Sequence, residues 1–169
     1  YFSITGSGPG ILGEMLASAL NVNAMVWRSS PAGTELEEQA LAWLREILGL
    51  PTFFDGTIND TASSSTLYAM AAARDAKLPL ASETGLSGVQ RGRFYTSDQA
   101  HSSVDKAAMT LGFGREGVLR IPSDEDFRMR SGALREVILA DRKEGIRPLG
   151  VIPTLGTTST TTVDPLPEI

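Results

Sequence analysis

The sequence predicts an α/β fold with a mainly parallel sheet and flanking helices. The first observation is that, beyond residue 92, short apolar runs alternate with stretches whose apolar residues recur every three or four positions. Strands are expected at 93–96, 118–121 and 149–154, and helices between them at 102–113 and 131–144. This order implies right-handed crossovers and parallel pairing. The second observation is a composition of 41% apolar and 21% charged residues in a chain of 169, which is typical of a globular domain with a sizeable core.

Composition also excludes several classes of function. A formal charge of −5 argues against nucleic-acid binding, which needs a basic face. The chain has no cysteine and one histidine, which excludes disulfides, thiolate metal sites and histidine-rich metal centres. No apolar run approaches the roughly 20 residues of a membrane span. We therefore expect a cytoplasmic protein with no metal, no nucleic-acid partner and no membrane partner.

The chain is predicted to divide into an N-terminal helical segment, residues 1–50, and an α/β body, residues 51–169. The helix expected at 10–20 is apolar around much of its circumference and needs cover from another surface. A second helix, at 34–48, begins with the capping-box pattern Thr34-Glu35-Leu36-Glu37. The remaining expectations are a short strand or turn at 52–58, an alanine-rich helix at 63–76 and a glycine-containing loop at 81–92.

His101, the only histidine, is placed at a strand-to-helix junction. The strand at 93–96 is followed by a polar turn and then by the helix that begins at 102. Ligands usually bind at this edge of an α/β sheet. A lone histidine is more often a satisfied structural residue, so from residue type alone both interpretations stay open. We expect Asp98 to cap the helix that follows.

Two hydroxyl-rich segments are further candidates. Thr61-Ala62-Ser63 precedes the alanine-rich helix, where unpaired backbone amides and the helix dipole favour an anion. Serine and threonine are also the usual helix N-caps, so a purely structural role is the alternative. The segment 154–162 holds six threonines in nine residues at the end of a predicted strand. Threonine favours strands, but buried hydroxyls need partners, so packing alone does not explain this density.

Five segments together, in register over the whole chain, resemble the pyridoxal-phosphate-dependent group II amino-acid decarboxylases, whose best-known members act on aromatic L-amino acids. The segments are Tyr1-Phe2, Ser30-Pro31-Ala32-Gly33-Thr34-Glu35-Leu36-Glu37, Thr61-Ala62-Ser63, Ser97-Asp98-Gln99-Ala100-His101-Ser102-Ser103 and Thr154-Leu155-Gly156-Thr157-Thr158. The resemblance implies part of the large domain of a fold-type I, aspartate-aminotransferase-like enzyme, incomplete at both ends. Residues 51–169 would then be a partial pyridoxal-phosphate-binding domain.

The resemblance also implies a role for individual residues. In that family the equivalent of His101 stacks on the cofactor ring, and the turn matched by Thr61, Ala62 and Ser63 cradles its phosphate. Asp60 departs from the family's glycine and should point away or bond the helix amides. The equivalent of Thr158 contacts the cofactor-bearing lysine or the substrate. The aromatic residues matched by Tyr1 and Phe2 line the substrate pocket, although Ser3 and Ile4 depart from the pattern there.

The family's catalytic lysine and ring-nitrogen aspartate have no counterpart in the chain. The three lysines, Lys77, Lys106 and Lys143, are each expected to be a solvated surface charge. We therefore expect an N-terminal and central fragment of a homodimeric decarboxylase, inactive alone. One alternative is a non-catalytic truncated or split piece that acts by assembling with another chain. Another is a glutamate-type decarboxylase or an aldehyde synthase of the same fold.

Overall fold

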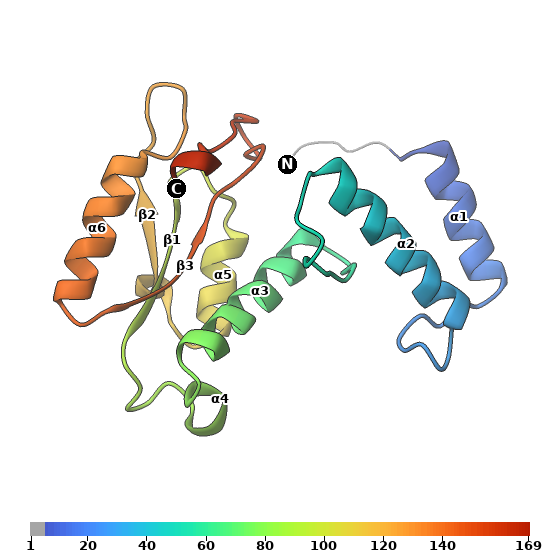
Figure 1. The fold of residues 1–169 in the computed structure, drawn as a ribbon, viewed down its shortest axis with the longest axis horizontal. Helices are drawn as coiled ribbons and strands as arrows, with labels where there is room; N and C mark the ends of the chain where they lie inside the picture. Colours follow the sequence, from blue (N-terminus) through green and yellow to red (C-terminus); the bar gives the residue numbers. More distant parts are fainter. Residues whose placement is uncertain (1–5) are drawn as a thin grey trace. The chain divides into compact units, whose positions relative to one another are not determined.

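The computed structural model describes residues 6–169, which divide into two compact units (Figure 1). The first unit runs to Ile58 and the second is Asn59–Ile169. Tyr1 and Phe2, the predicted pocket residues, lie outside the described part of the chain. The second unit contains the sheet and all the remaining predicted site residues.

The sheet has three parallel strands in the order β2-β1-β3. The strands are β1 (Gly92–Ser97), β2 (Val118–Ile121) and β3 (Arg147–Ile152). In the central strand, Thr96 pairs with Arg120 on one side and with Ile152 on the other. The predicted parallel sheet is therefore confirmed, and the carboxyl ends of its strands lie along one edge.

Helices cover both faces of this sheet, because side chains of adjacent strand residues point to opposite sides. Phe94 packs under α3 (Ala62–Lys77) and α5 (Ser103–Thr110), whereas Tyr95 packs under α6 (Ser131–Lys143). Figure 1 shows these helices on the two sides of the sheet. Each face has its own apolar cluster, one formed by Met70, Leu78, Ala81, Phe94, Val104, Ala107, Ala108, Val118 and Leu149, and the other by Tyr95, Ile121, Met129 and Leu134.

The helix α3 runs antiparallel to the strands. Its early residues Ser65 and Thr66 line a surface pocket together with Ile152, at the end of β3. Its last residue, Lys77, lines a different pocket with Arg147, at the start of β3. The N-terminus of α3 therefore lies at the same edge of the unit as the carboxyl ends of the strands.

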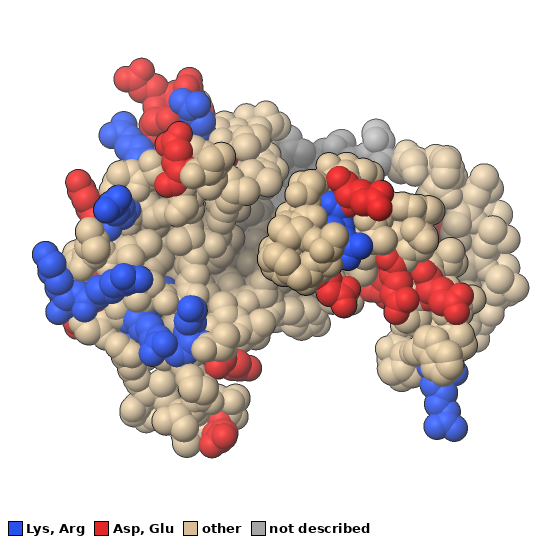
Figure 2. Space-filling model, in the orientation of Figure 1, with Lys and Arg blue, Asp and Glu red and all other residues tan. Residues whose placement is uncertain are grey.

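The first unit contains α1 (Gly8–Ala19) and α2 (Pro31–Ile47), neither of which has a buried residue. The apolar side chains of α1 are largely exposed, with Leu12 and Leu16 at 61% and 64%. Figure 2 shows α1 as an almost uncharged surface. This agrees with the sequence of α1, in which Glu14 is the one charged residue.

The predicted capping box at Thr34 is wrong. The helix α2 begins at Pro31, three residues before the expected start at 34, with Ser30 as its N-cap, and the Ser30 Oγ accepts the amide of Gly33 at 3.3 Å. Proline at the first helical position suits this start, because its φ is already helical and it lacks an amide that would need a partner. Thr34 donates its hydroxyl to the Ser30 carbonyl, and Glu37 accepts the Ile58 amide at 2.6 Å instead of capping α2.

Other boundaries differ by a few residues, as expected where ends depend on tertiary contacts. The predicted loop at 81–92 contains a short helix, α4 (Ala81–Thr84). Of the two alternatives expected at 52–58, a short strand or a turn, the structure has a turn at 52–53 and no strand. Two short 3-10 turns, η1 (Arg115–Gly117) and η2 (Leu166–Glu168), precede β2 and end the chain. Within residues 6–169, no helix has both the length and the apolar character needed to cross a membrane.

Candidate functional site

Three of the predicted segments lie at the carboxyl edge of the sheet. The His101 segment follows β1, and the threonine-rich segment follows the adjacent strand β3. The Thr96 hydroxyl donates to the Ile152 carbonyl at 2.8 Å, directly before the two segments leave the sheet. Thr61, at the N-terminus of α3, lies at the same edge. An imidazole, a helix N-terminus and a hydroxyl-rich turn therefore lie at the carboxyl edge of the sheet, where α/β proteins usually bind ligands.

His101 is exposed, and one ring nitrogen is engaged by the backbone. The amide of Ser103 donates to Nδ1 of His101 at 3.2 Å. Because Nδ1 acts as an acceptor, the neutral ring carries its proton on Nε2. The imidazole is therefore held at the start of α5, on an exposed residue.

The expectation that Asp98 caps α5 is wrong. Its carboxylate instead accepts the amide of Ser123 at 3.2 Å and the side chain of Gln99 at 3.1 Å. Partial burial raises the pKa of Asp98, but the hydrogen bonds from Ser123 and Gln99 and the charge of Arg120 outweigh it and hold that pKa below its usual value. Asp98 therefore ties the turn before His101 to the loop after β2.

The N-terminus of α3 offers unused donors to an anion. Thr61 is the N-cap, and its Oγ1 accepts the amide of Ser64 at 3.2 Å. The amides of Ala62 and Ser63 have no hydrogen-bond partner among the described residues. Both residues are small and exposed, so an anion can approach these amides closely. Asp60 makes no hydrogen bond to the helix within the described residues, and Thr61 alone provides the cap.

The threonine-rich turn owes much of its composition to its own folding. Thr157 is buried, with 1% exposure. Its Oγ1 lies 2.5 Å from the hydroxyl of Thr160 and accepts the amide of Thr162 at 3.0 Å. Thr158, the residue predicted to act at the site, is exposed. Thr157 therefore stabilises the turn, whereas the exposed side chain of Thr158 is accessible to a ligand.

Asp164 is a residue that sequence reasoning missed. It is buried, with 1% exposure, and both carboxylate oxygens accept backbone amides at 2.8 Å, one from Met129 and one from Thr154. These bonds tie the loop after β2 to the loop after β3. The sequence does contain a signal for this residue. Asp164 is a single carboxylate between Val163 and Pro165, after a run of hydroxyl residues, and a carboxylate in apolar surroundings is expected to have hydrogen-bond partners.

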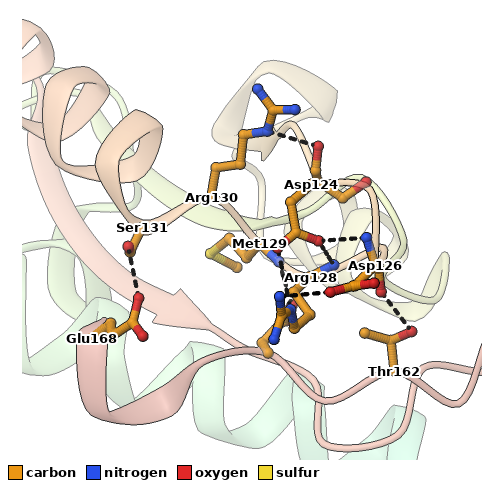
Figure 3. A network of polar contacts seen from close by, with 10 residues as sticks. Asp124, Asp126, Arg128, Met129, Arg130, Ser131, Thr162 and Glu168 are labelled. Carbon is orange, nitrogen blue, oxygen red and sulfur yellow. Dashed lines mark hydrogen bonds and ion pairs between the residues drawn. The ribbon is translucent and has the colours of Figure 1, made fainter.

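The loop between β2 and α6 completes this edge of the unit (Figure 3). Asp124 organises the loop by accepting the amides of Asp126 and Arg128, each at 2.9 Å. Figure 2 shows acidic and basic side chains side by side on this loop. The helix α6 begins at Ser131, whose hydroxyl donates to Glu168 at 3.3 Å and does not cap the helix.

The three lysines are all exposed and lie on helices, at Lys77 in α3, Lys106 in α5 and Lys143 in α6. None of them belongs to the loops at the carboxyl ends of the strands. Among residues 6–169 there is also no group of three or more acidic or histidine side chains placed to hold a metal ion.

Comparison with known proteins identifies the family of the chain. The family model described as the pyridoxal-dependent decarboxylase conserved domain matches residues 1–169. The chain is 40% identical to tyrosine/DOPA decarboxylase 2 of Papaver somniferum, where the match covers all of this chain and 33% of that protein. It is also 40% identical to histidine decarboxylase of Mus musculus, covering all of this chain and 27% of the relative.

A solved structure of a relative shares the fold of this chain. The structure of Oryza sativa TDC with PLP and tryptamine superposes with a TM-score of 0.87 at 38% identity, covering 97% of this chain and 35% of that one. The chain thus spans about a third of the length of the relatives it matches. The family match over the whole chain and the shared large-domain fold agree with each other, and the chain belongs to the pyridoxal-dependent decarboxylase family.

Proposed function

We propose that this chain is part of an enzyme that decarboxylates an L-amino acid with an aromatic side chain, with pyridoxal phosphate as cofactor. The observation that carries the proposal is the position of His101 and the free amides of Ala62 and Ser63 at one edge of a sheet that belongs to this family. The aromatic preference is supported by relatives named for tyrosine, DOPA and histidine and by a structure that holds tryptamine.

The donors at the start of α3 fit the cofactor's phosphate. The amides of Ala62 and Ser63 bind its oxygens, the Ser63 hydroxyl adds a donor, and the helix dipole favours the negative charge. His101 presents a ring face to the cofactor ring, while its Nδ1 stays engaged with the Ser103 amide. When bound, the cofactor supplies the electron sink that lets the carboxylate leave.

Thr158 is proposed to orient the substrate. Its hydroxyl is exposed on a turn that Thr157 fixes from beneath, so Thr158 can donate a hydrogen bond without rearranging the loop. Tyr1 and Phe2 are proposed as apolar walls of the pocket for the substrate side chain. The ring-nitrogen carboxylate and the catalytic lysine would come from residues other than these 169, since the three lysines lie on exposed helix surfaces.

A homodimer in the cytoplasm forms part of the proposal. The apolar side chains of α1 and of the segment after it support an oligomer, because Leu20 and Trp27 are 74% and 62% exposed. Such a surface is usually covered by another protein surface. Sedimentation of the full-length protein tests this point, and a stable monomer at micromolar concentration contradicts it.

The experiment that tests the proposed function measures carbon dioxide release by the full-length protein from each of the twenty amino acids, with and without added pyridoxal phosphate. We expect release from an aromatic substrate that depends on the cofactor, with one amine formed per carbon dioxide. Formation of an aldehyde in place of the amine supports the aldehyde-synthase alternative, and release from glutamate supports the glutamate-type alternative. No release from any amino acid contradicts the proposal.

A further inference from the structure

Arg120, in β2, contacts the chain on both sides of His101. Its Nη1 lies 3.3 Å from the carbonyl oxygen of Ser97, 3.3 Å from that of Asp98 and 3.2 Å from that of Ala100. Its Nη2 pairs with Oδ2 of Asp105 at 2.5 Å. Ala100 immediately precedes His101, and Asp105 lies in the first turn of α5. One guanidinium thus joins the turn before the histidine to the helix after it.

The chemistry of the guanidinium group suits this arrangement. Its nitrogens present several donors in a rigid plane, so one end can serve converging carbonyl oxygens while the other pairs with a carboxylate. The side chains of Arg120 and Asp105 are 33% and 25% exposed, so the ion pair is partly shielded from water. Charge-assisted hydrogen bonds of this kind are stronger than those between neutral groups. Arg120 therefore helps to fix the path of the chain around His101 from β2, alongside the bond between Asp98 and Ser123.

The ring of His101 depends on that path. Within the described residues, its one hydrogen bond is the one that Nδ1 accepts from the amide of Ser103. That amide belongs to the first turn of α5, which Asp105 links to Arg120. A shift of the turn or of the helix start therefore moves the imidazole, although within the described residues no hydrogen bond joins Arg120 to the ring.

We propose that Arg120 is a positioning residue that sets the orientation of the His101 ring toward the cofactor, acting through the backbone at 97–100 and through Asp105. This proposal rests on the proposed function, in which His101 stacks on the cofactor ring. A lysine at position 120 keeps the positive charge but has a single ammonium group, which cannot span the carbonyl oxygens and the carboxylate together.

The test is a double-mutant cycle in the full-length protein, with the dissociation constant for pyridoxal phosphate and the visible circular dichroism of the bound cofactor as readouts. The variants are Arg120→Lys, His101→Ala and the pair. Arg91→Lys is the matched control, because Arg91 forms an exposed ion pair with Glu116 at 3.1 Å elsewhere in the same unit. The melting midpoint of each variant separates loss of the fold from loss of positioning.

We expect Arg120→Lys to weaken cofactor binding roughly two- to tenfold, the range for loss of one aromatic stacking contact, and to change the dichroism in the same direction as His101→Ala. In the His101→Ala background, Arg120→Lys should change the affinity less than about twofold, because coupled residues are not additive. Arg91→Lys should match the wild type.

Two results overturn the positioning role while leaving His101 in place. One is an unchanged affinity in Arg120→Lys, and the other is the same fold-loss in both backgrounds. If His101→Ala itself leaves affinity unchanged, the role of His101 in the proposed function fails first, and the positioning role falls with it. If Arg120→Lys does not fold, Asp105→Asn replaces it in the cycle, because that variant keeps the guanidinium and removes only the ion pair.

Discussion

Replacing Asp164 with alanine removes the carboxylate that joins the loops after β2 and β3. The amide of Met129, which is buried, and that of Thr154, which is half-buried, each lose a partner at 2.8 Å. An unsatisfied buried amide costs about 1–3 kcal/mol, so Asp164→Ala should destabilise this part of the fold by about 2–5 kcal/mol. Asp164→Asn should destabilise the fold about half as much as Asp164→Ala does. The side-chain oxygen of asparagine still accepts one of the two hydrogen bonds, while its NH2 group faces the other donor.

Hydrogen exchange in the full-length protein measures this effect locally. We expect the amides of Met129 and Thr154 to lose protection together in Asp164→Ala, since local opening of the two loops becomes easier. Asp126→Ala is the control, because the Asp126 side chain is 72% exposed and its ion pair with Arg128 contributes less than about 1 kcal/mol. Unchanged protection of both amides in Asp164→Ala would refute the reasoning, as would an equal effect in the control.

Two further predictions concern stability. Tyr95→Phe should cost about 1.5–3 kcal/mol, because the Tyr95 hydroxyl donates to the buried Asp141 carboxylate at 2.6 Å. Burial and the hydrogen bond to Asp141 raise the pKa of Tyr95 above its ordinary value of 10. The neutral Tyr95 hydroxyl therefore contributes its full share to the free energy of unfolding below pH 10, and this share is lost as the pH rises above 10. Denaturation from pH 8 to 11 should show this loss in the wild type and not in Tyr95→Phe, and parallel profiles contradict it. Ser30→Ala should lower stability by about 0.5–2 kcal/mol and Thr34→Ala by clearly less, as thermal unfolding can measure, because Ser30 caps α2. A larger loss of stability in Thr34→Ala than in Ser30→Ala would contradict this and support a cap at Thr34.

The parallel sheet and its helices could be predicted from the sequence because local pattern and tertiary structure agree there. The strand at 118–121 was predicted with the bounds that the structure shows, and α6 differs by one residue. β2 is a short apolar run that packs on both faces of the sheet, with Val118 in one cluster and Ile121 in the other, whereas α6 packs Leu134, Val137 and Ile138 at helical spacing. The three lysines are exposed, as was expected because lysine is rarely buried.

The caps could not be predicted reliably because a polar side chain has several partners within reach. Asp98 was expected to cap α5, but Ser123, which is 25 residues away in the sequence, offers its amide across the strand ends. Glu37 likewise meets Ile58 from a distant part of the first unit. Such long-range partners follow from tertiary packing and have no local sequence signal, and the same holds for the contacts of Arg120 and Asp164.

The central claim is that the carboxyl edge of this sheet binds pyridoxal phosphate, with His101 stacked on its ring. The most direct measurement is the cofactor's dissociation constant for full-length His101→Ala beside that of the wild type, with the melting midpoint of each cofactor-free protein. Loss of a stacking contact contributes about 0.5–1.5 kcal/mol, so the account predicts binding weakened up to about tenfold with an unchanged melting midpoint. His101→Phe should restore most of that binding, because it keeps an aromatic face. A lower melting midpoint with unchanged cofactor affinity would contradict the account, because it would make His101 a structural cap of α5 and nothing more.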